Sequence, residues 1–232
     1  MLPLLFNQKW CILKRMRLVI ELVINFVQKL RFKFGLDRKR YILKHIRKYA
    51  CVNILEIGVF NGNFAYRMLN TAKKKSPNLQ INYVGVDLFE ANFSSEIALS
   101  EVSLTPKNKL YIEEYLKIPN VNVNLLEGYS SSVLPSLDLE KKFDLIVIDG
   151  GHSYSTVKKD FENSLHLLHQ NGAIIFDDYT NYRGTVSGGF GINQVINELD
   201  KLKFLVSISS IRDFFWKPYG LLVLRMVTVR LK

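Results

Sequence analysis

The sequence predicts one α/β domain with a doubly wound, mostly parallel sheet, preceded by basic helices and completed by an antiparallel strand near the C-terminus. Short apolar runs alternate with amphipathic helical segments, which is typical of successive β-α-β units. Several of these runs end in Gly or in an acidic residue, as parallel strands do at the sheet edge that binds ligands. The 232 residues, 48% of them hydrophobic, suffice for one such domain with an appendage, or at most for two small domains.

Residues 1–48 carry the net charge of the chain, and we expect them to form a basic, amphipathic helical segment before a domain of residues 49–232. They hold thirteen Lys and Arg residues against Glu21 and Asp37, which equals the net charge of +11. The other residues hold 19 basic and 19 acidic side chains, so the domain itself is neutral. One of the predicted helices covers 38–50.

The function of this basic segment has several alternatives. It could rest on an anionic membrane surface, bind RNA phosphates, cover a partner, or pack on the domain with its basic face in solvent. Its apolar runs are too short and too interrupted to span a membrane, and no small-residue cleavage site follows them. Cys11 and Cys51 lack metal-ligand spacing and indicate a reducing compartment. We therefore expect a cytoplasmic protein, either free or attached to the periphery of a membrane.

The first strand of the domain runs into a glycine-rich turn, Glu56-x-Gly58-x-x-x-Gly62, and a helix over 64–75 follows. Glycine lets a backbone turn tightly and approach a ligand closely. The spacing differs from the G-x-G-x-x-G that seats a pyrophosphate. Glu56 would also disfavour a diphosphate and suits a positively charged group such as an amino-acid ammonium. The alternative interpretation is a plain strand-to-helix turn.

The second and third strands, over 81–86 and 121–126, also end at polar residues. Asp87 follows the second strand, where a carboxylate commonly binds the hydroxyls of a ribose. Ser130 and Ser131 lie in the loop after the third strand, at the same edge of the sheet, and could line an adenine. Both features are also explained as helix N-caps.

The stretch 143–178 is the most informative part of the chain. Its apolar runs 145–148 and 173–176 predict two buried strands. Between them, Ser153 is a candidate N-cap and Asn171-Gly172 a candidate stop for one helix. The apolar residues of that helix recur at helical spacing: Val157, Phe161, Leu165 and Leu168. Such a unit predicts parallel strands joined by a right-handed crossover.

Three carboxylates follow these two strands. Asp149 ends the first, and Asp177 and Asp178 end the second. If the strands are neighbours, these side chains converge and repel one another unless a cation is present or one of them is protonated. Oxygen ligands suit Mg²⁺ or a similar hard cation. His152, three residues after Asp149, could act as a general base; otherwise the acids merely cap loops and His152 is a solvated loop residue.

The remaining predicted elements are helices over 109–116 and 192–202 and strands over 204–210 and 221–229. Two longer connections could shape an acceptor pocket. The first, 89–105, is long enough for a lid or a substrate loop. The second, 179–191, is studded with glycines and aromatic residues.

These motifs carry a family resemblance. The segments ILEIGVFNG, GVDLF, FDLIVIDGGHSY and IIFDDY resemble the successive motifs of class I S-adenosylmethionine-dependent methyltransferases. The closer resemblance is to the metal-dependent small-molecule O-methyltransferases, which include the macrocin O-methyltransferase type of sugar enzyme. It covers roughly residues 50–200 and implies a Rossmann-like fold. Relatives often carry Glu or Asn at one position of the second acidic pair, where this chain has two Asp residues.

The resemblance also implies roles for individual residues. The implied ligands of S-adenosylmethionine are Glu56, Gly58 and Gly62 at the methionine end, Asp87 at the ribose, and Ser130 or Ser131 near the adenine. The implied Mg²⁺ ligands are Asp149, Asp177 and Asp178. His152 would be the base that deprotonates the acceptor.

We therefore expect an O-methyltransferase that acts on a hydroxyl of a small molecule such as a sugar. One alternative is an RNA methyltransferase recruited by the basic N-terminus, although the chain lacks a base-stacking N/D-P-P-Y/F motif. Another is a non-enzymatic protein that keeps the fold and binds a membrane or a partner. A dinucleotide oxidoreductase is disfavoured by the glycine spacing.

Overall fold

The computed structural model describes residues 19, 22–24, 26–89, 108–137, 142–180, 191–217 and 220–232. Its strands are β1 (Asn53–Ile57), β2 (Ile81–Asp87), β3 (Val121–Glu127), β4 (Phe143–Ile148), β5 (Leu168–Thr180), β6 (Phe204–Lys217) and β7 (Gly220–Leu231). Its named helices are α2 (Arg40–Tyr49), α3 (Asn63–Lys75), α5 (Lys109–Tyr115), α6 (Ser130–Val133), the 3₁₀ turn η1 (Leu134–Ser136), α7 (Tyr154–Leu165) and α8 (Gly191–Glu198). The predicted lid over 89–105, apart from Phe89, and residues 181–190 of the predicted glycine-rich loop lie outside this description.

The strands form one sheet in the order β3-β2-β1-β4-β5-β7-β6. β1 pairs in parallel with both β2 and β4, so the order reverses beside β1. β4 and β5 are parallel neighbours, as the sequence predicts, while β7 pairs antiparallel with β5 and β6. The fold is therefore a Rossmann-like, mostly parallel sheet with an antiparallel C-terminal pair, and its predicted class is confirmed.

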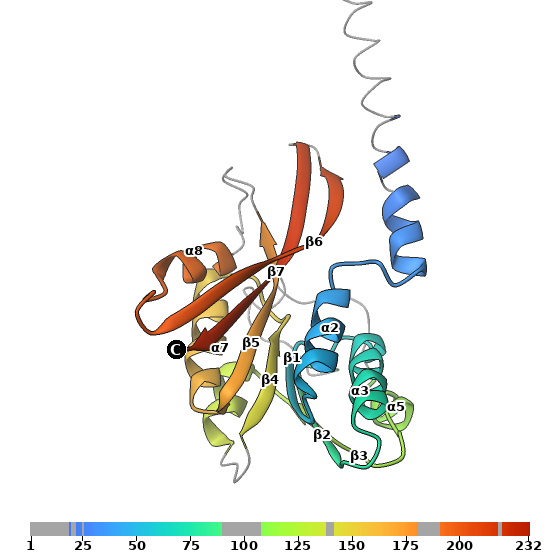
Figure 1. Cartoon of the computed structure of the whole chain (residues 1–232), viewed down its shortest axis with the longest axis vertical. Coiled ribbons are helices and arrows are strands. Elements are labelled where there is room, and N and C mark those ends of the chain that lie inside the picture. The colour runs from blue at the N-terminus through green and yellow to red at the C-terminus, as the bar shows by residue number, and fades with distance from the viewer. Residues whose placement is uncertain are drawn as a thin grey trace, which may run out of the picture.

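Helices cover both faces of this sheet (Figure 1). One apolar core joins α2, α3 and α5 to the sheet, through residues such as Ile46, Met68 and Ile112. The other joins α7 and α8 to the opposite face, through residues such as Phe161 and Val195. Each face therefore buries apolar side chains, which is why the central strands read as continuous apolar runs rather than alternating ones.

The unit from β4 to β5 differs from its predicted form at one end. Ser153 caps α7 as expected, with its Oγ accepting from the backbone N–H of Thr156 at 3.3 Å. However, α7 ends at Leu165, and Leu168 begins β5 opposite Phe143 instead of extending the helix. In this strand Leu168 is buried in the same apolar core as Val157 and Phe161 of α7. Its helical spacing in the sequence therefore did not distinguish a helix from a strand.

Other boundaries also move. Strand β6 continues to Lys217, beyond the predicted residue 210. Asn171-Gly172, predicted to stop the helix before β5, lies inside this strand. Helix α8 ends at Glu198, earlier than the predicted residue 202. Helix ends carry weaker local signals than the apolar periodicity of their interiors.

The N-terminal segment approaches the sheet from the side of β6. Residues 22–24 and 26–33 are helical, and the helix predicted over 38–50 is present as α2. The helix over 26–33 contacts β6, because the side-chain oxygen of Gln28 accepts from the Phe214 N–H at 3.3 Å and Arg31 Nη2 donates to the Arg212 carbonyl at 2.6 Å. Among the described residues, none of the helices has the length and apolar character that crossing a membrane requires.

Candidate functional site

The glycine-rich turn lies where the strand order reverses. Gly58 follows β1 with a φ of +92°, and its N–H donates to the Val86 carbonyl at 2.9 Å. A Cβ on Gly58 would lie 2.1 Å from the Asp149 carbonyl oxygen, so only glycine fits between β1 and the end of β4. Gly62, with a φ of +77°, precedes α3. The predicted ligand loop therefore starts at the sheet's switch point, where open α/β sheets bind ligands.

Glu56 lies within β1, just beneath this turn, and is buried. Burial raises the pKa of its carboxyl group to about 8, although the hydroxyl of Tyr83, which donates to it, works in the opposite direction. A cationic group beside Glu56 would favour its ionised form, because opposite charges stabilise each other in a buried site. The position therefore suits the ammonium group that the sequence predicts as its ligand.

Asp87 connects the turn to the end of β2. Its carboxylate accepts from the N–H groups of Phe60 at 2.8 Å, Leu88 at 2.7 Å and Phe89 at 3.2 Å. These bonds hold the β1 turn against the β2 turn. The predicted contact of Asp87 with a ribose remains a prediction.

The two serines predicted near an adenine have different surroundings. Ser130 begins α6, and its Oγ donates to Asp160 Oδ1 at 2.6 Å. Asp160 belongs to α7, so this bond joins the β3 loop to the helix that follows β4. Ser131 is exposed. Their role in binding a nucleoside also stays a prediction.

The three carboxylates converge as the sequence predicts, but they are already paired with two cations from the N-terminal segment. Asp149 directly follows Ile148, which is paired with Phe176 of β5, so Asp149 and Asp177 leave neighbouring strands at one edge. Asp178 has a φ of +61°, a conformation that turns the chain after Asp177. The side chains of Arg38 and Lys39, just before α2, reach this edge.

Arg38 bonds to several of these acids at once. Its Nε and Nη2 donate to the two oxygens of Asp177 at 2.5 and 3.0 Å, and Nη2 also donates to Asp178 Oδ1 at 2.6 Å. On its other side, Nη1 and the backbone N–H both donate to Asp213 Oδ2 at 3.1 Å. The planar guanidinium thus joins the end of β5 to β6.

Lys39 takes the other side of the cluster. Its Nζ donates to Asp149 Oδ2 at 2.6 Å and lies 4.0 Å from Asp177 Oδ2. The same ammonium lies 4.7 Å from the ring centroid of Phe64, at the start of α3. Lys39 therefore sits between the ends of β4 and β5.

The ionisation of the cluster follows from burial and pairing. Burial would lower the pKa values of Arg38 and Lys39, but the surrounding carboxylates outweigh it and raise both, so both side chains are cationic. Burial acts to raise the pKa of Asp177, yet the charges of Arg38 and Lys39 leave it lowered. Burial raises the pKa of Asp149 and of Asp178, against the opposing charges of the two cations. Asp177 is therefore the most firmly ionised of the three acids.

This arrangement does not fit the Mg²⁺ that the sequence predicts. Each of Asp149, Asp177 and Asp178 directs at least one oxygen to Arg38 or Lys39. A divalent ion bridging Asp149 and Asp177 would meet the ammonium of Lys39. Across the described ranges, no group of three or more His, Cys, Asp or Glu side chains is arranged to hold a metal ion. The expected metal ligands are thus brought together, but around basic side chains.

His152 lies beside the cluster, as its sequence position predicts. Its Nε2 is 3.6 Å from Asp178 Oδ2, and 44% of its side chain is exposed. An imidazole that touches both solvent and a carboxylate can take up a proton from a bound acceptor and be stabilised by its neighbour. Its role as a base remains a prediction.

Arg38, Lys39 and Asp213 were not among the predicted site residues. The first two were assigned to a basic segment outside the domain, and Asp213 to the connection between the predicted strands 204–210 and 221–229, whereas it lies in β6. A weak signal existed for Asp213, because an acidic residue directly before Phe214 and Phe215 needs a partner if it is buried with them. For Arg38 and Lys39 there was no such signal, because a run of basic residues does not indicate which acidic residues they will contact.

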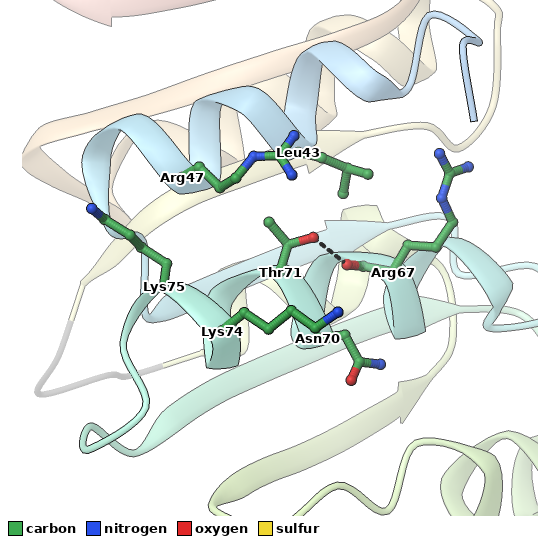
Figure 2. Close-up of a pocket in the computed structure, with 7 residues that line it drawn as sticks. All are labelled: Leu43, Arg47, Arg67, Asn70, Thr71, Lys74 and Lys75. Atoms are coloured by element: carbon green, nitrogen blue, oxygen red, sulfur yellow. Dashed lines mark hydrogen bonds between the residues drawn. The ribbon is translucent and has the colours of Figure 1, made fainter. Parts of the chain in front are cut away.

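A second feature is a groove between α2 and α3, which we call the basic groove. It has a volume of about 490 Å³ and is lined by Leu43, Arg47, Arg67, Asn70, Thr71, Lys74 and Lys75. Figure 2 shows Leu43 and Arg47 on α2 opposite the residues of α3. Arg67 also bonds to Asp37 at 3.2 Å, which places one end of the basic groove next to Arg38.

Comparisons with known proteins agree with this geometry. Residues 55–179, more than half of the chain, match the family described as a methyltransferase domain. An uncharacterised protein of Acanthamoeba polyphaga mimivirus is 27% identical over 154 residues. That match covers 65% of this chain, and the chain spans only 62% of the length of the viral protein.

Solved structures share the fold. An O-methyltransferase from Bacillus cereus in complex with S-adenosylhomocysteine has 14% identity and a TM-score of 0.56, with 89% of this chain and 90% of that chain covered. The O-methyltransferase of tomaymycin synthesis from Streptomyces achromogenes, in complex with S-adenosylmethionine, has 15% identity and a TM-score of 0.55, with 83% and 79% covered. At these identities the likeness concerns the fold alone.

Proposed function

Because the chain belongs to the methyltransferase domain family, we propose that it is an S-adenosylmethionine-dependent O-methyltransferase that acts on a hydroxyl group of a small molecule, such as a sugar. The observation that carries the proposal is the turn from Glu56 to Gly62. It lies at the switch point of the sheet, with a buried carboxyl beneath it that suits an ammonium group.

The proposed chemistry uses few residues. The cofactor, when bound, supplies an electrophilic methyl group. Glu56 holds the ammonium of its methionine end, and the turn at Gly58 lets the backbone approach it. His152 takes the proton from the acceptor hydroxyl as the methyl–oxygen bond forms and the methyl–sulfur bond breaks. No step uses a metal ion, because Arg38 and Lys39 are bonded to the acidic cluster.

The first prediction concerns the cofactor. The purified full-length chain is expected to bind S-adenosylhomocysteine in a calorimetric titration and to give no heat with NAD. Glu56→Gln should weaken binding by about tenfold or more, since it removes the charge that faces the ammonium. Binding of NAD without S-adenosylhomocysteine would reject the proposal.

The Glu56 variant has an informative counterpart in stability. When folding raises the pKa of a carboxyl group, the folded protein loses stability as that group ionises. For Glu56 the loss builds up as the pH rises from the pKa of the unfolded chain toward the folded pKa of about 8. Glu56→Gln should therefore make the ligand-free protein more stable than wild type at pH 8 while weakening its cofactor binding. A melting series from pH 5 to pH 8 measures this, and a parallel loss of stability and binding would point to a structural role only.

The acceptor class needs a direct screen. Methyl transfer from labelled S-adenosylmethionine should be measured against sugars, nucleotide sugars and catechols. We expect transfer to a hydroxylated small molecule and none to RNA. Transfer to RNA alone would replace the small-molecule proposal.

The second prediction concerns His152 and uses the acceptor that this screen identifies. His152→Ala is expected to lower kcat by about 10²–10⁴, the usual contribution of a general base. Affinity for S-adenosylhomocysteine should stay near that of wild type, because Glu56 and Gly58 lie on the turn after β1. An unchanged kcat would place the base elsewhere.

We further propose that the N-terminal part of the chain associates with an anionic membrane surface. The basic groove offers Arg47, Lys74 and Lys75 as exposed cations that suit phosphate headgroups. In the helical residues 22–24 and 26–33, several apolar side chains are exposed to solvent: Leu22, Val23, Phe26, Val27 and Leu30. Interfacial helices bind membranes through a combination of basic and apolar surface.

The third prediction tests this surface with vesicles of phosphatidylcholine and phosphatidylserine. The triple variant Arg47→Gln, Lys74→Gln, Lys75→Gln should lose about 1 kcal/mol of binding free energy per residue. Added salt should weaken wild-type binding, since surface charge is screened within about 8 Å at physiological ionic strength.

The matched control removes three exposed lysines from other elements, Lys117, Lys159 and Lys201, and should retain binding. S-adenosylhomocysteine binding should be the same in both triple variants. Equal losses of vesicle binding, or binding to RNA rather than to vesicles, would contradict the membrane proposal.

A further inference from the structure

We propose that Arg38 and Lys39 are a built-in cation pair that takes the place of a divalent metal ion at the acidic cluster, so that this active site works without one. The inference rests on the proposed function, because it assigns the cluster to the site of methyl transfer. It concerns two residues of the basic N-terminal segment, which thereby become positioning residues of the site.

The ammonium of Lys39 lies where a metal ion that bridges Asp149 and Asp177 would lie. It lies 2.6 Å from Asp149 Oδ2 and 4.0 Å from Asp177 Oδ2, between the two strand ends whose carboxylates a bridging metal ion would join. A metal ion bound to both oxygens would have to displace Lys39 from this position. The displaced ammonium would then lose its bonded carboxylate in a setting where only 26% of its side chain is exposed.

Arg38 donates hydrogen bonds from all three nitrogens of its guanidinium. Its guanidinium contacts Asp177, Asp178 and Asp213 together, and its side chain is only 10% exposed. A bidentate Arg–carboxylate pair is directional and well suited to a buried position. Asp213, which is fully buried, also accepts from the backbone N–H of Arg38. This backbone bond fixes the start of the side chain, so Arg38 is held at two points.

Arg38 and Lys39 bring two positive charges to the cluster, the same charge as a divalent cation. Burying additional positive charge next to them would add repulsion, while removing them would leave carboxylates buried without a partner. Part of the negative charge of the cluster is thus balanced by the chain itself. Arg38 holds Asp178 in place, and Asp178 in turn lies beside His152.

Contacts on both sides hold residues 37–39 in place. Asp37, which is buried, bonds to Arg67 of α3 at 3.2 Å, and α2 begins directly after Lys39. On the other side, Arg31 Nη2 lies 3.5 Å from Asp213 Oδ1. The cation pair therefore sits between two attached segments.

The test is a titration of the full-length chain with Mn²⁺, a paramagnetic divalent ion, followed by electron paramagnetic resonance. Wild type is expected to show no saturable binding. Lys39→Met frees Asp149, so this variant should bind Mn²⁺ at least about tenfold more tightly than wild type. Adding Asp149→Asn should abolish the gained binding, and Lys39→Arg should behave like wild type because it keeps the charge. Lys117→Met, an exposed lysine paired with Glu114, is the control and should change nothing.

Two results would overturn the inference. One is saturable Mn²⁺ binding by wild type that Asp149→Asn removes, which would make the cluster a metal site with mobile basic residues. The other is an absence of Mn²⁺ binding in Lys39→Met as well, which would show that the cluster is no cation site of that kind.

A measurement on wild type alone guards against variants that fail to fold. The melting temperature and the S-adenosylhomocysteine affinity of wild type should be the same in excess EDTA and in Mg²⁺, and a clear loss in EDTA would contradict the inference. Failure of S-adenosylhomocysteine binding under both conditions would instead refute the proposed function, so the two failures are distinguishable.

Discussion

Replacing Arg38 with Met is expected to lower the free energy of unfolding by about 3–5 kcal/mol, the usual cost of removing one partner of a buried ion pair. The variant leaves Asp177 and Asp213 without their main cation, and both are buried. Arg38→Lys keeps the charge but loses the planar double bond to Asp177, so its loss should be intermediate. Urea unfolding at pH 7 measures all three proteins.

The loss should depend on pH in a defined direction. In wild type, the lowered pKa of Asp177 stabilises the fold above the unfolded pKa of an aspartate, and this stability disappears as the pH falls through the folded value. Without Arg38, burial raises the pKa of Asp177 instead, and the variant gains stability as the pH falls. The difference between the two proteins should therefore be largest near pH 7 and shrink toward pH 4.

Arg67→Met is the matched control. Arg67 is also an arginine paired with a buried aspartate, Asp37, but 35% of its side chain is exposed and the bond is a single contact at 3.2 Å. Such a pair is worth about 1 kcal/mol or less. An equal loss for both arginines would show that burial within the acidic cluster is not what makes Arg38 important.

Replacing Gly58 with Ala is expected to abolish the fold around the predicted cofactor turn. Its added Cβ would lie 2.1 Å from the Asp149 carbonyl oxygen and 2.6 Å from the carbonyl carbon, and these are backbone atoms that no rotamer change can move. The φ of +92° adds strain for any side chain. The destabilisation should exceed about 4 kcal/mol, which is a large part of the stability of a typical domain. Soluble yield, cooperative unfolding and S-adenosylhomocysteine binding should all fall.

Gly150→Ala is the control for this change. Gly150 lies in the same site, next to Asp149, but a Cβ there would approach nothing closer than 3.4 Å, to Ile57 Cγ2. Its φ is not positive, so alanine fits its backbone. We expect it to fold with stability close to that of wild type. Normal folding of Gly58→Ala would show that β1 and β4 can separate at their ends without cost.

The central strands and their order of appearance were predictable from local patterns. A run such as Leu145–Ile148 is buried on both faces, which in an α/β protein occurs in the parallel sheet. The glycine spacing after β1 and the candidate N-cap Ser153 were also local signals, and the structure bears out the elements they delimit. The β-α-β connection predicted that Asp149 and Asp177 converge if their strands are neighbours, and the parallel pairing of β4 with β5 fulfils that condition.

Boundaries were less predictable. Leu168 matches the period of α7, yet it lies in β5, since pairing with Phe143 buries it as well as a further helical turn would. The decision between these two positions depends on a strand that is distant in the sequence. Local periodicity cannot report it.

The sequence by itself determined that three carboxylates meet at one edge of a Rossmann-like sheet, and that they need positive charge there. Only the tertiary structure decided which side chains supply that charge. Arg38 is 139 residues away from Asp177 and 175 away from Asp213, and Lys39 is 110 away from Asp149. Composition assigned these bases to a basic N-terminal segment whose role stayed open, because a charge pattern does not show which groups the charges will contact. The path of the chain before α2 brings them to the acids, where burial makes each pairing necessary.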